Sequence, residues 1–561
     1  MAGESGSGTG GGGANGAADL ILRGGRVYTA DAVGRWAGAV AVRDGRIVAV
    51  GFDADVRDLA GPSTRVVDVR GGLVLPGFQD AHIHPAYAGQ GMGQASLHDV
   101  FSADEYVHLI REWAKAHPDA PWVVGDGWFM DAFEGGNPPK ELLDDAVPDR
   151  PAYSASRDGH SAWVNSRALE LAGITRDTPD PADGVIIRRA DGEPHGTLHE
   201  GANHLVEDLI PADTEDEWVE SILRAQAYLH ALGITAWQDA IVRDDVGPAY
   251  RRLAEDGRLT ARVVGALWWE RDQGDEQVKR MIERRGDYSF GRFRATYIKL
   301  MQDGIVENFT AGMTESYLDA EGRPTGNTGK SFVEPEALKR AVTMLDAEGF
   351  QCHFHAIGDR AVREALDAVG AARQANGWND HRHHIAHIQL IHPADVPRFR
   401  EVGAVANAQP LWACAEGQME HLTIPFIGPE RAAWQYPFRS LERTGAVIAM
   451  GSDWSVSTPN PLLEMEVAVR RVAPDDRDHE PFYPDEALSL KSAIGGFTIG
   501  SAYVNHLDDE TGTIRPGKLA DLCVLDRDVF APDAGYLGDA KVVLTLVDGE
   551  PVHADASGVS W

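Results

Sequence analysis

Residues 73–85 read LVLPGFQDAHIHP, an apolar run that leads directly into two histidines separated by one residue. Alternate residues of a strand point to the same side, so His82 and His84 can present both imidazoles on one face near the strand's end. Two imidazoles in that arrangement suit zinc or a related divalent metal. Two ordinary surface histidines would look the same, so the rest of the chain has to decide between these interpretations.

Three later side chains repeat the pattern of an apolar strand that ends in a metal-ligating or acidic group. In FQCHFHAIGDRAV, His355 lies nearer the strand's end than His353 and is the better ligand. His387 lies inside the apolar run IAHIQL, where a histidine can instead be a hydrogen-bonded core residue. Asp453 follows the buried run in AVIAMGSDW, where a carboxylate is costly unless it is paired, hydrogen-bonded or metal-bound. A turn or a helix cap is its alternative role.

Strand and helix signals alternate through the middle of the chain, which predicts a parallel sheet or barrel. The stretches Asp359–Gln374 and Pro393–Val402, for example, are amphipathic and lie between apolar runs. The histidines and Asp453 each come at a strand's end, and barrel active sites form at the carboxyl ends of the strands. The apolar runs expected to be buried strands are residues 73–78, 235–238, 296–301, 350–354, 385–388, 404–408 and 447–450.

Both ends of the chain read as short β-rich runs with Gly-Gly and Asp-Gly turns. We therefore expect a TIM-like (β/α)8 barrel with a small β-sandwich formed by both chain ends; two unrelated terminal β segments are the alternative. A long mobile loop is expected at residues 303–332, near one strand end. The expected ranges are a flexible Gly-rich tail over 1–17, the sandwich over 18–75 and 506–561, and the barrel over 76–505 with an inserted region at about 86–230.

The composition of the 561 residues, with 43% hydrophobic and 25% charged, is that of an ordinary soluble globular protein. A net charge of -34 argues against nucleic acid or an anionic membrane as a partner. The sequence has no apolar run long enough to span a membrane, and its Gly-rich start does not resemble a secretory signal. Three scattered cysteines, Cys352, Cys414 and Cys523, predict no disulfide framework and fit a cytoplasmic protein. We expect a small-molecule substrate and, from base rates, a homodimer.

Lys299 lies in the apolar run ATYIKLMQDG, in a chain with nine lysines and 43 arginines. A buried cation beside metal dications would be repelled. The conflict disappears if the amine has reacted with carbon dioxide to give an anionic carbamate, which arginine cannot form because it stays protonated. We therefore predict an N6-carboxylated Lys299 that bridges two metal ions. The alternative is an ion pair with a nearby carboxylate such as Asp303.

Further residues are candidates for the substrate pocket. His160, in DGHSAWVNS, is predicted to orient the substrate or polarise its carbonyl group, with a structural role as the alternative. Glu200, in GTLHEGA, is an alternative metal ligand or a pocket carboxylate, and Asp303 is a further pocket candidate. Tryptophans could line an aromatic pocket, although any single one is more often a core residue. They are Trp122, Trp128, Trp163 and Trp412, of which Trp128 is the principal candidate.

These segments together resemble the amidohydrolase superfamily, specifically the amidohydrolase 3 or YtcJ-like branch, which includes N-substituted formamide deformylases. The matching segments run in the family's order from about residue 19 to 550: PGFQDAHIHP, DGHSAWVNSRAL, GTLHEGA, IKLMQDG, HFHAIGDRAV, RHHIAHIQL, GSDWSV and GTIRPGKLADL. The resemblance implies a barrel with a β-sandwich, metal ligands at His82, His84, His355 and His387, a carboxylated Lys299 and a catalytic Asp453.

The chain departs from the family at Ala386, where a glutamate often precedes the last metal-site histidine. Adjacent strand residues face opposite ways, so Ala386 should not remove a ligand, although it can change the support behind the metal site.

The predicted activity is hydrolysis of a non-peptide C–N bond, in an N-substituted formamide, amide or related compound, by water activated on one or two divalent ions, with zinc expected. Asp453 would take a proton from the water and pass it to the leaving nitrogen, while the metal and His160 stabilise the oxyanion. One alternative is an aminohydrolase that deaminates a ring, but deaminases of the family usually lack a lysine like Lys299. The other is a catalytically silent regulatory protein on the same fold, which need not keep so many strand-end histidines.

Overall fold

Eight parallel strands form the central sheet of the computed structural model, which describes residues 16–555 and 558–560. Their order is β21-β20-β19-β18-β17-β16-β15-β8, so the strands follow the chain around a nearly closed barrel. The fold class predicted from the sequence is confirmed. The strands are β8 (Phe78–Ile83), β15 (Ile234–Val242), β16 (Arg262–Trp268), β17 (Phe293–Met301), β18 (Gln351–Ala356), β19 (His384–His387), β20 (Val405–Ala408) and β21 (Ile448–Met450).

The apolar run 73–78 does not form one strand, which corrects the sequence prediction. It is divided at Gly77 between β7 (Leu73–Pro76) of the sandwich and β8 of the barrel. A Cβ atom at Gly77 would lie 2.4 Å from the Thr235 side chain, so only glycine fits at this crossing. Strand β16 was not among the predicted runs, because it begins with Arg262 and Gly265 interrupts its apolar pattern.

Strand β18 shows why the barrel carries histidines inside and apolar side chains outside. All six of its residues are buried, as expected for a parallel strand covered on both sides. Cys352 and Phe354 belong to the main hydrophobic core together with residues of α10 (Pro335–Ala347) and α11 (Asp359–Asn376). His353 and His355 alternate with them and therefore point into the barrel.

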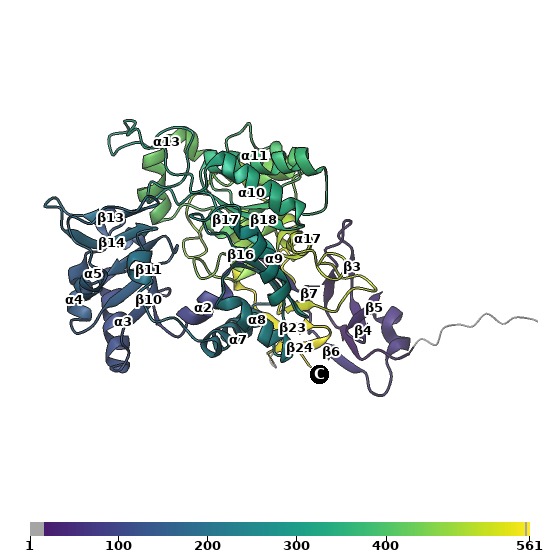
Figure 1. Cartoon of the computed structure of the whole chain (residues 1–561). Helices are drawn as coiled ribbons and strands as arrows, with labels where there is room; N and C mark the ends of the chain where they lie inside the picture. The colour runs from purple at the N-terminus through teal and green to yellow at the C-terminus, as the bar shows by residue number, and fades with distance from the viewer. Residues whose placement is uncertain (1–15, 556–557, 561) are drawn as a thin grey trace, which may run out of the picture.

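Helices cover the outside of the barrel (Figure 1). Helix α7 begins with a capping box, in which Thr214 Oγ1 accepts from the Glu217 N–H (3.3 Å) and the Glu217 carboxylate accepts from the Thr214 N–H (2.7 Å). Among the described residues, no helix combines the length and the apolar character needed to cross a membrane. Besides α10 and α11, the helices are α7 (Glu215–Ala231), α8 (Val246–Glu255), α9 (Gln277–Tyr288), α12 (Arg398–Val402), α13 (Ile424–Ala432), α14 (Phe438–Thr444), α15 (Pro461–Arg470), α16 (Leu490–Gly495) and α17 (Ser501–Val504).

The two end strands of the barrel, β21 and β8, are joined by bonds just beyond β21. The Asp453 N–H donates to the His82 carbonyl (2.8 Å), and the His84 N–H donates to the Trp454 carbonyl (2.9 Å). The buried carboxylate of Asp80 accepts from the Ser452 hydroxyl across the same seam (2.6 Å). The barrel therefore closes through the residues that carry the strand-end histidines and Asp453.

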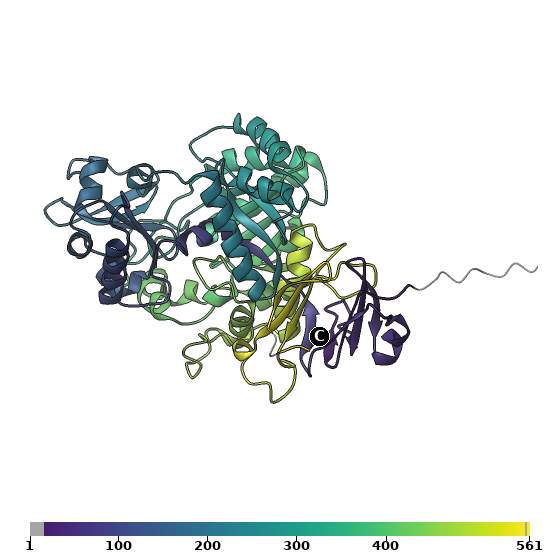
Figure 2. The same ribbon diagram turned by 90° about the horizontal axis from the view of Figure 1, so that it is seen from below.

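Both ends of the chain form one sandwich. Strand β7 pairs antiparallel with β22 (Leu522–Leu525), with Val74 opposite Val524, which joins the N-terminal and C-terminal segments in a single sheet. Figure 2 shows the purple N-terminal and yellow C-terminal strands side by side. This sheet has the order β24-β23-β22-β7-β2-β3, and the facing sheet has the order β5-β4-β1-β6. Their remaining strands are β1 (Leu20–Arg23), β2 (Arg26–Tyr28), β3 (Trp36–Ala37), β4 (Ala39–Arg43), β5 (Arg46–Gly51), β6 (Arg65–Asp68), β23 (Val542–Val547) and β24 (Glu550–Ala554).

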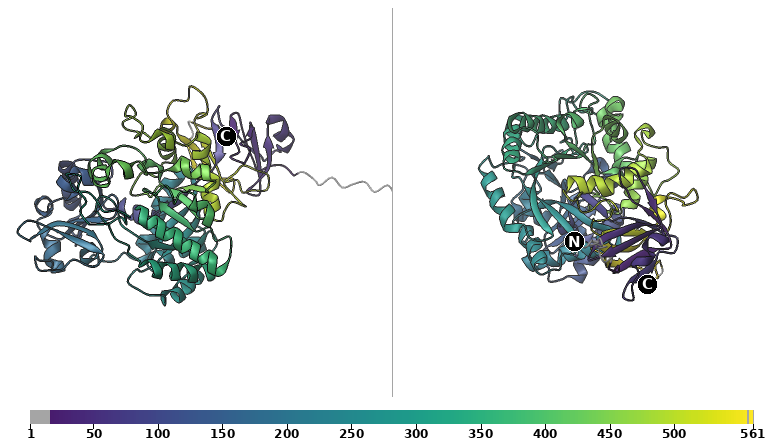
Figure 3. Two further views of the ribbon diagram at one scale, coloured as in Figure 1. Left: turned by 90° about the horizontal axis from the view of Figure 1, so that it is seen from above. Right: turned by 90° about the vertical axis from the view of Figure 1, so that its right-hand side faces the viewer.

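A fourth sheet lies between β8 and β15 in the sequence, with the order β13-β14-β12-β11-β10-β9. It projects from the barrel at the end opposite the sandwich, as the views agree (Figures 1 and 3). Residues 1–15 of the predicted tail lie outside the described residues. The elements of the inserted domain are β9 (Ala95–Ser96), β10 (Val123–Trp128), β11 (Ala152–Ser156), β12 (Ser161–Val164), β13 (Gly184–Arg188) and β14 (Pro194–Glu200), with α2 (Pro85–Gly91), α3 (Ala103–Ala116), α4 (Lys140–Ala146), α5 (Ser166–Ala172) and α6 (His204–Glu207).

Candidate metal centre

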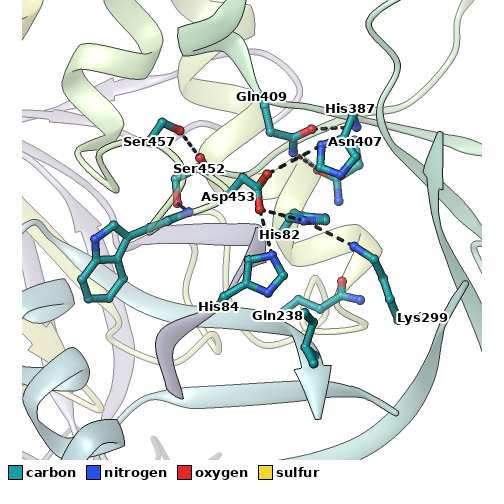
Figure 4. A network of polar contacts seen from close by, with 12 residues as sticks. His82, His84, Gln238, Lys299, His387, Asn407, Gln409, Ser452, Asp453 and Ser457 are labelled. Carbon is teal, nitrogen blue, oxygen red and sulfur yellow. Dashed lines mark hydrogen bonds and ion pairs between the residues drawn. The ribbon is translucent and has the colours of Figure 1, made fainter. Parts of the chain in front are cut away.

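Three of the predicted site residues converge on one point at the barrel seam (Figure 4). Asp453 Oδ1 lies 3.1 Å from His82 Nε2 and 2.8 Å from His84 Nε2. One ligand atom from each of these residues lies within 4.8 Å of the other two, which is close enough to share one ion. His82 lies in strand β8, His84 follows the end of that strand, and the turn after β21 supplies the carboxylate, so the seam bonds fix their relative positions.

The other predicted ligands lie around this group. Lys299 Nζ on β17 is 3.4 Å from His82 Nε2, and His387 Nδ1 at the end of β19 is 3.9 Å from Asp453 Oδ2. The His355 and His387 rings are 4.4 Å apart, centre to centre. Six residues chosen from the sequence are thus brought together by β8, β17, β18, β19 and the turn after β21.

The buried atoms of this cluster that have no hydrogen bond include Asp453 Oδ1 and His387 Nδ1. A buried polar atom without a partner is costly, and such atoms are rare in native proteins. Both would be satisfied as ligands of a cation, and their nitrogen and oxygen chemistry suits zinc or a similar divalent metal. The residues therefore fit a metal ion.

Burial also keeps the ring nitrogens in the form that a metal ion needs. Desolvation, reinforced by the positive charge of Lys299 and neighbouring rings, lowers the pKa of His82 well below its usual value. Desolvation acts in the same way on the pKa of His355 and of His387. The three imidazoles are neutral at physiological pH, with a lone pair free for a metal ion.

Lys299 is buried, with an exposed fraction of 2%. Burial lowers its pKa to about 7, against the opposing pull of Asp453 and Asp239. Near neutral pH a large fraction of the amine is therefore uncharged. The alternative partner considered from the sequence, Asp303, forms no ion pair with Lys299 in the described part of the chain.

Asp303 instead holds the loop after β17 in place. Its carboxylate accepts from the backbone N–H groups of Gly312 (2.8 Å), Ile357 (3.0 Å) and Gly358 (2.8 Å). Its Oδ1 lies 3.7 Å from His355 Nε2, which contacts the Gly304 carbonyl at 3.3 Å. Asp303 thus supports the wall of the site beside His355.

His160 and Glu200 reach the site from the inserted domain as an ion pair. His160 Nδ1 lies 2.9 Å from Glu200 Oε2, and Thr310 donates to the other carboxylate oxygen (2.6 Å). Burial pushes the pKa of His160 down, but the charge and hydrogen bond of Glu200 outweigh it and raise this pKa to about 9. The ring centres of His160 and His355 are 5.3 Å apart. A charged imidazolium thus lies beside the metal cluster, and Glu200 holds it there.

Several of these residues have a backbone conformation that non-glycine residues rarely adopt. The φ angles are +54° at Glu200, +74° at His387 and +56° at Asp453. Such residues cost free energy and collect at functional sites, where the surrounding structure holds them. Aspartate tolerates this region better than most residues, which suits it to the turn after β21.

A layer of buried polar residues behind His82 was not predicted from the sequence. His353 Nε2 lies 2.7 Å from His82 Nδ1, and Gln238 lies 2.9 Å from the other nitrogen of His353. His384 and Asn407 extend this layer. The available signal was polarity at positions that face into the barrel from otherwise apolar strands, such as Gln238 in β15.

The predicted tryptophan pocket needs correction. Trp128 has an exposed fraction of 0% and donates from its indole to the Ser154 carbonyl (2.9 Å), so it lies in the core of the inserted domain and does not line a pocket. Trp163 is equally buried there, and Trp122 packs in a second core of that domain. Trp412 alone among the four contacts a site residue, because its ring stacks on His387 with centres 5.3 Å apart.

A second cluster has the composition of a metal site but a different hydrogen-bond pattern. Asp346 Oδ1 accepts from His381 Nδ1 (2.9 Å) and His383 Nε2 (2.8 Å). His383 Nδ1 accepts from the Cys352 N–H (2.9 Å), so its Nε2 carries the proton and has no lone pair for a metal. This cluster is a closed hydrogen-bond network.

The chain matches the Amidohydrolase family over residues 65–553. It is 31% identical to "Protein LONG AFTER FAR-RED 3" of Arabidopsis thaliana, over 96% of this chain and 92% of the relative. It is 29% identical to "Putative amidohydrolase YtcJ" of Bacillus subtilis, over 95% and 99%. It is 28% identical to "N-substituted formamide deformylase" of Arthrobacter pascens, over 95% and 97%.

Solved structures share the fold at lower identity. An uncharacterized metal-dependent hydrolase from Pyrococcus horikoshii superposes with a TM-score of 0.72 at 23% identity, over 93% of this chain and 99% of that one. Atrazine chlorohydrolase TrzN from Arthrobacter aurescens, complexed with zinc, superposes with a TM-score of 0.54 at 16% identity, over 95% of each chain.

Proposed function

Because this chain belongs to the amidohydrolase family, we propose that it is a metal-dependent hydrolase of a non-peptide C–N bond in an N-substituted formamide, an amide or a related compound. The observation that carries the proposal is the convergence of His82, His84 and Asp453 with a buried carboxylate oxygen that has no hydrogen bond. The similarity to an N-substituted formamide deformylase over nearly the whole chain supports this substrate class.

His82, His84 and Asp453 would hold one ion, and His355 and His387 would hold a second. Lys299 lies beside His82, and its lowered pKa supports reaction of the amine with carbon dioxide to a carbamate, which would supply an anionic ligand there. The nitrogen and carboxylate donors favour zinc. A bound divalent ion supplies Lewis acidity and lowers the pKa of a water molecule from about 15.7 to near 7.

Asp453 is the group that moves the proton. Its pKa is lowered, because contacts with His84, His387 and Lys299 outweigh the effect of burial, so the carboxylate is ionised and can accept a proton from the attacking water. It then returns that proton to the leaving nitrogen, since amines leave poorly as anions. The fixed turn after β21 keeps the Asp453 carboxylate in the same position for both transfers.

His160 would stabilise the negative charge that forms on the carbonyl oxygen. Its pKa of about 9 keeps the ring charged at neutral pH, and Glu200 occupies Nδ1, which leaves Nε2 as the free donor. A fixed donor of this kind contributes on the order of 10²–10³ in rate.

The test is metal analysis of the purified chain combined with a screen of N-substituted formamides, amides and hydantoins. We expect bound zinc and release of an amine together with formate or another carboxylate. Release of ammonia from a ring substrate would show a deaminase instead. A purified chain that binds no divalent metal would contradict the proposal and favour a silent scaffold.

A further inference from the structure

A buried hydrogen-bond network connects the backbone of β8 and β19 to the ring of His82. We propose that a relay starting at Asn407 fixes the tautomer in which His82 offers Nε2 to a metal ion. The relay passes through His384, Gln238 and His353. This inference deepens the proposed function and rests on it, because it concerns how one ligand of the metal centre is prepared.

Two backbone groups fix the direction of the relay at its start. The His387 N–H donates to Gln409 Oε1 (2.7 Å), so the Gln409 nitrogen faces Asn407 and donates to its Oδ1 (3.1 Å). Asn407 Nδ2 in turn donates to the carbonyl of Ala81 (2.8 Å), which can only accept. The Asn407 amide therefore has one possible orientation.

The second N–H of Asn407 determines the proton position on His384. Asn407 Nδ2 lies 3.0 Å from His384 Nδ1, which must accept. A neutral imidazole carries one proton, so the His384 proton is on Nε2. That N–H points at the side-chain amide of Gln238, 3.2 Å away.

Gln238 must then present its oxygen to the two rings. The structure has the Gln238 nitrogen facing His384 Nε2 and His353 Nδ1, with the amide oxygen left without a partner. In that orientation the Gln238 N–H and the His384 Nε2–H point at each other, and neither has an acceptor. Turning the amide by 180° removes the conflict, and its oxygen then accepts from both rings; the two ends of an amide have the same shape, so hydrogen bonding decides between them.

The proton positions on the last two rings follow. His353 donates from Nδ1 to Gln238, so its Nε2 accepts from His82 Nδ1 at 2.7 Å. His82 then carries its proton on Nδ1 and has its lone pair on Nε2, the atom that lies 3.1 Å from Asp453 Oδ1. Partners behind a ligating histidine generally fix its tautomer in this way, and losing them typically weakens metal binding about 10–100-fold.

The test reads the proton positions directly in the metal-free full-length chain labelled with ¹⁵N-histidine. Two-bond nitrogen–proton correlations show which ring nitrogen carries the proton, and zinc affinity is measured separately by competition with a chelator. We expect His82 and His353 as Nδ1–H and His384 as Nε2–H. Any other assignment for His82 in the wild-type chain overturns the relay, even if every variant fails to fold.

Three substitutions reverse, remove or preserve the relay. Asn407→Asp offers only acceptors, which forces the His384 proton to Nδ1 and reverses every later step, so zinc affinity should fall about 10–100-fold. Asn407→Leu has a similar size but imposes no direction, and its loss should be smaller. Gln238→Glu still accepts from both rings and should keep the His82 tautomer. Unchanged affinity and an unchanged tautomer in Asn407→Asp would contradict the inference.

The outcomes also separate this inference from the proposed function. A wild-type chain with the expected tautomers but no affinity for divalent metals would defeat the proposed function and leave the relay standing. A chain that binds zinc tightly with the His82 proton on Nε2 in the metal-free form would defeat the relay alone.

Discussion

The barrel contains two clusters of histidine and aspartate whose composition is alike and whose bonding differs. Around Asp346, the carboxylate accepts from His381, His383, Asn376 and Asn379, so its oxygens are fully occupied. Around Asp453, one carboxylate oxygen lies within 3.1 Å of two ring nitrogens yet has no hydrogen bond. We call the Asp346 cluster closed, because its carboxylate oxygens are occupied by hydrogen bonds. We call the Asp453 cluster open, because one of its carboxylate oxygens has none.

The difference teaches that residue type alone does not make a metal site. A ligand needs a free lone pair, and a ring whose second nitrogen already accepts from a backbone N–H, as in His383, has none to offer. We therefore expect the closed cluster to stabilise the fold and the open cluster to bind metal and carry the activity. The comparison would be wrong if substitutions in the closed cluster removed metal or if substitutions in the open cluster mainly lowered stability.

The largest effect is expected at the carboxylate of the open cluster. Asp453→Asn removes the proton acceptor and should lower kcat by about 10²–10⁴-fold, the usual contribution of a general acid–base group. The midpoint of unfolding of the metal-free chain should fall less than in a variant of Asp346, because Asp453 Oδ1 has no hydrogen bond to lose, whereas the Asp346 carboxylate accepts several. Steady-state kinetics with zinc content measured in parallel checks this. Turnover close to that of the wild type would contradict the role of Asp453.

The opposite result is expected at the carboxylate of the closed cluster. Asp346→Asn leaves several donors, including Arg373, without their buried anion, and should lower the free energy of unfolding by about 3–5 kcal/mol. Zinc content should not change. Glu283→Gln, on the exposed side of α9, serves as a control and should cost less than about 0.5 kcal/mol. Loss of zinc in Asp346→Asn with unchanged stability would break the comparison.

A smaller effect is expected at the ion pair of His160 and Glu200. Glu200 occupies Nδ1 of the ring, and Nε2 is left as a free donor. The pKa of His160, about 9, predicts that kcat/KM falls as the pH rises through this value and the ring loses its charge. Glu200→Gln removes the charge that raises this pKa, so burial dominates and the fall should move to lower pH. At pH 8 the variant should be about tenfold or more slower, since a charged donor is lost.

The pH profile of Asp158→Asn sharpens this prediction. Asp158 is a weaker contributor to the pKa of His160 than Glu200, so its loss should move the alkaline limb in the same direction by a smaller amount. If the fall of kcat/KM at high pH stays at the same pH in both variants, the group that loses its charge there is not His160.

The fold and most of the candidate centre could be predicted from the sequence, because apolar runs that end in a polar residue mark the ends of buried strands. Apolar runs that end in His82, His355 or Asp453 mark the carboxyl edge of a parallel barrel, and the structure brings these residues together. The joining of both chain ends in one β layer was expected from similar turn patterns at the two ends, and the pairing of β7 with β22 provides it.

Other features depend on contacts between segments that are distant in sequence, so local patterns could not reveal them. Trp128 looked available for a pocket, but the inserted sheet buries it. The residues behind His82 come from four strands, and neither Gln238 nor Asn407 has a local signature beyond its polarity. The dimer, the cytoplasmic location and the substrate stay predictions.

Zinc content per chain tests the central claim most directly. It should be compared among the wild type, the double substitution His82→Ala with His84→Ala, and the double substitution His381→Ala with His383→Ala. The account predicts one or two equivalents in the wild type, loss of at least one equivalent in the first variant, and wild-type content in the second. A wild type without metal, or a second variant that loses its metal while the first retains it, would contradict the account.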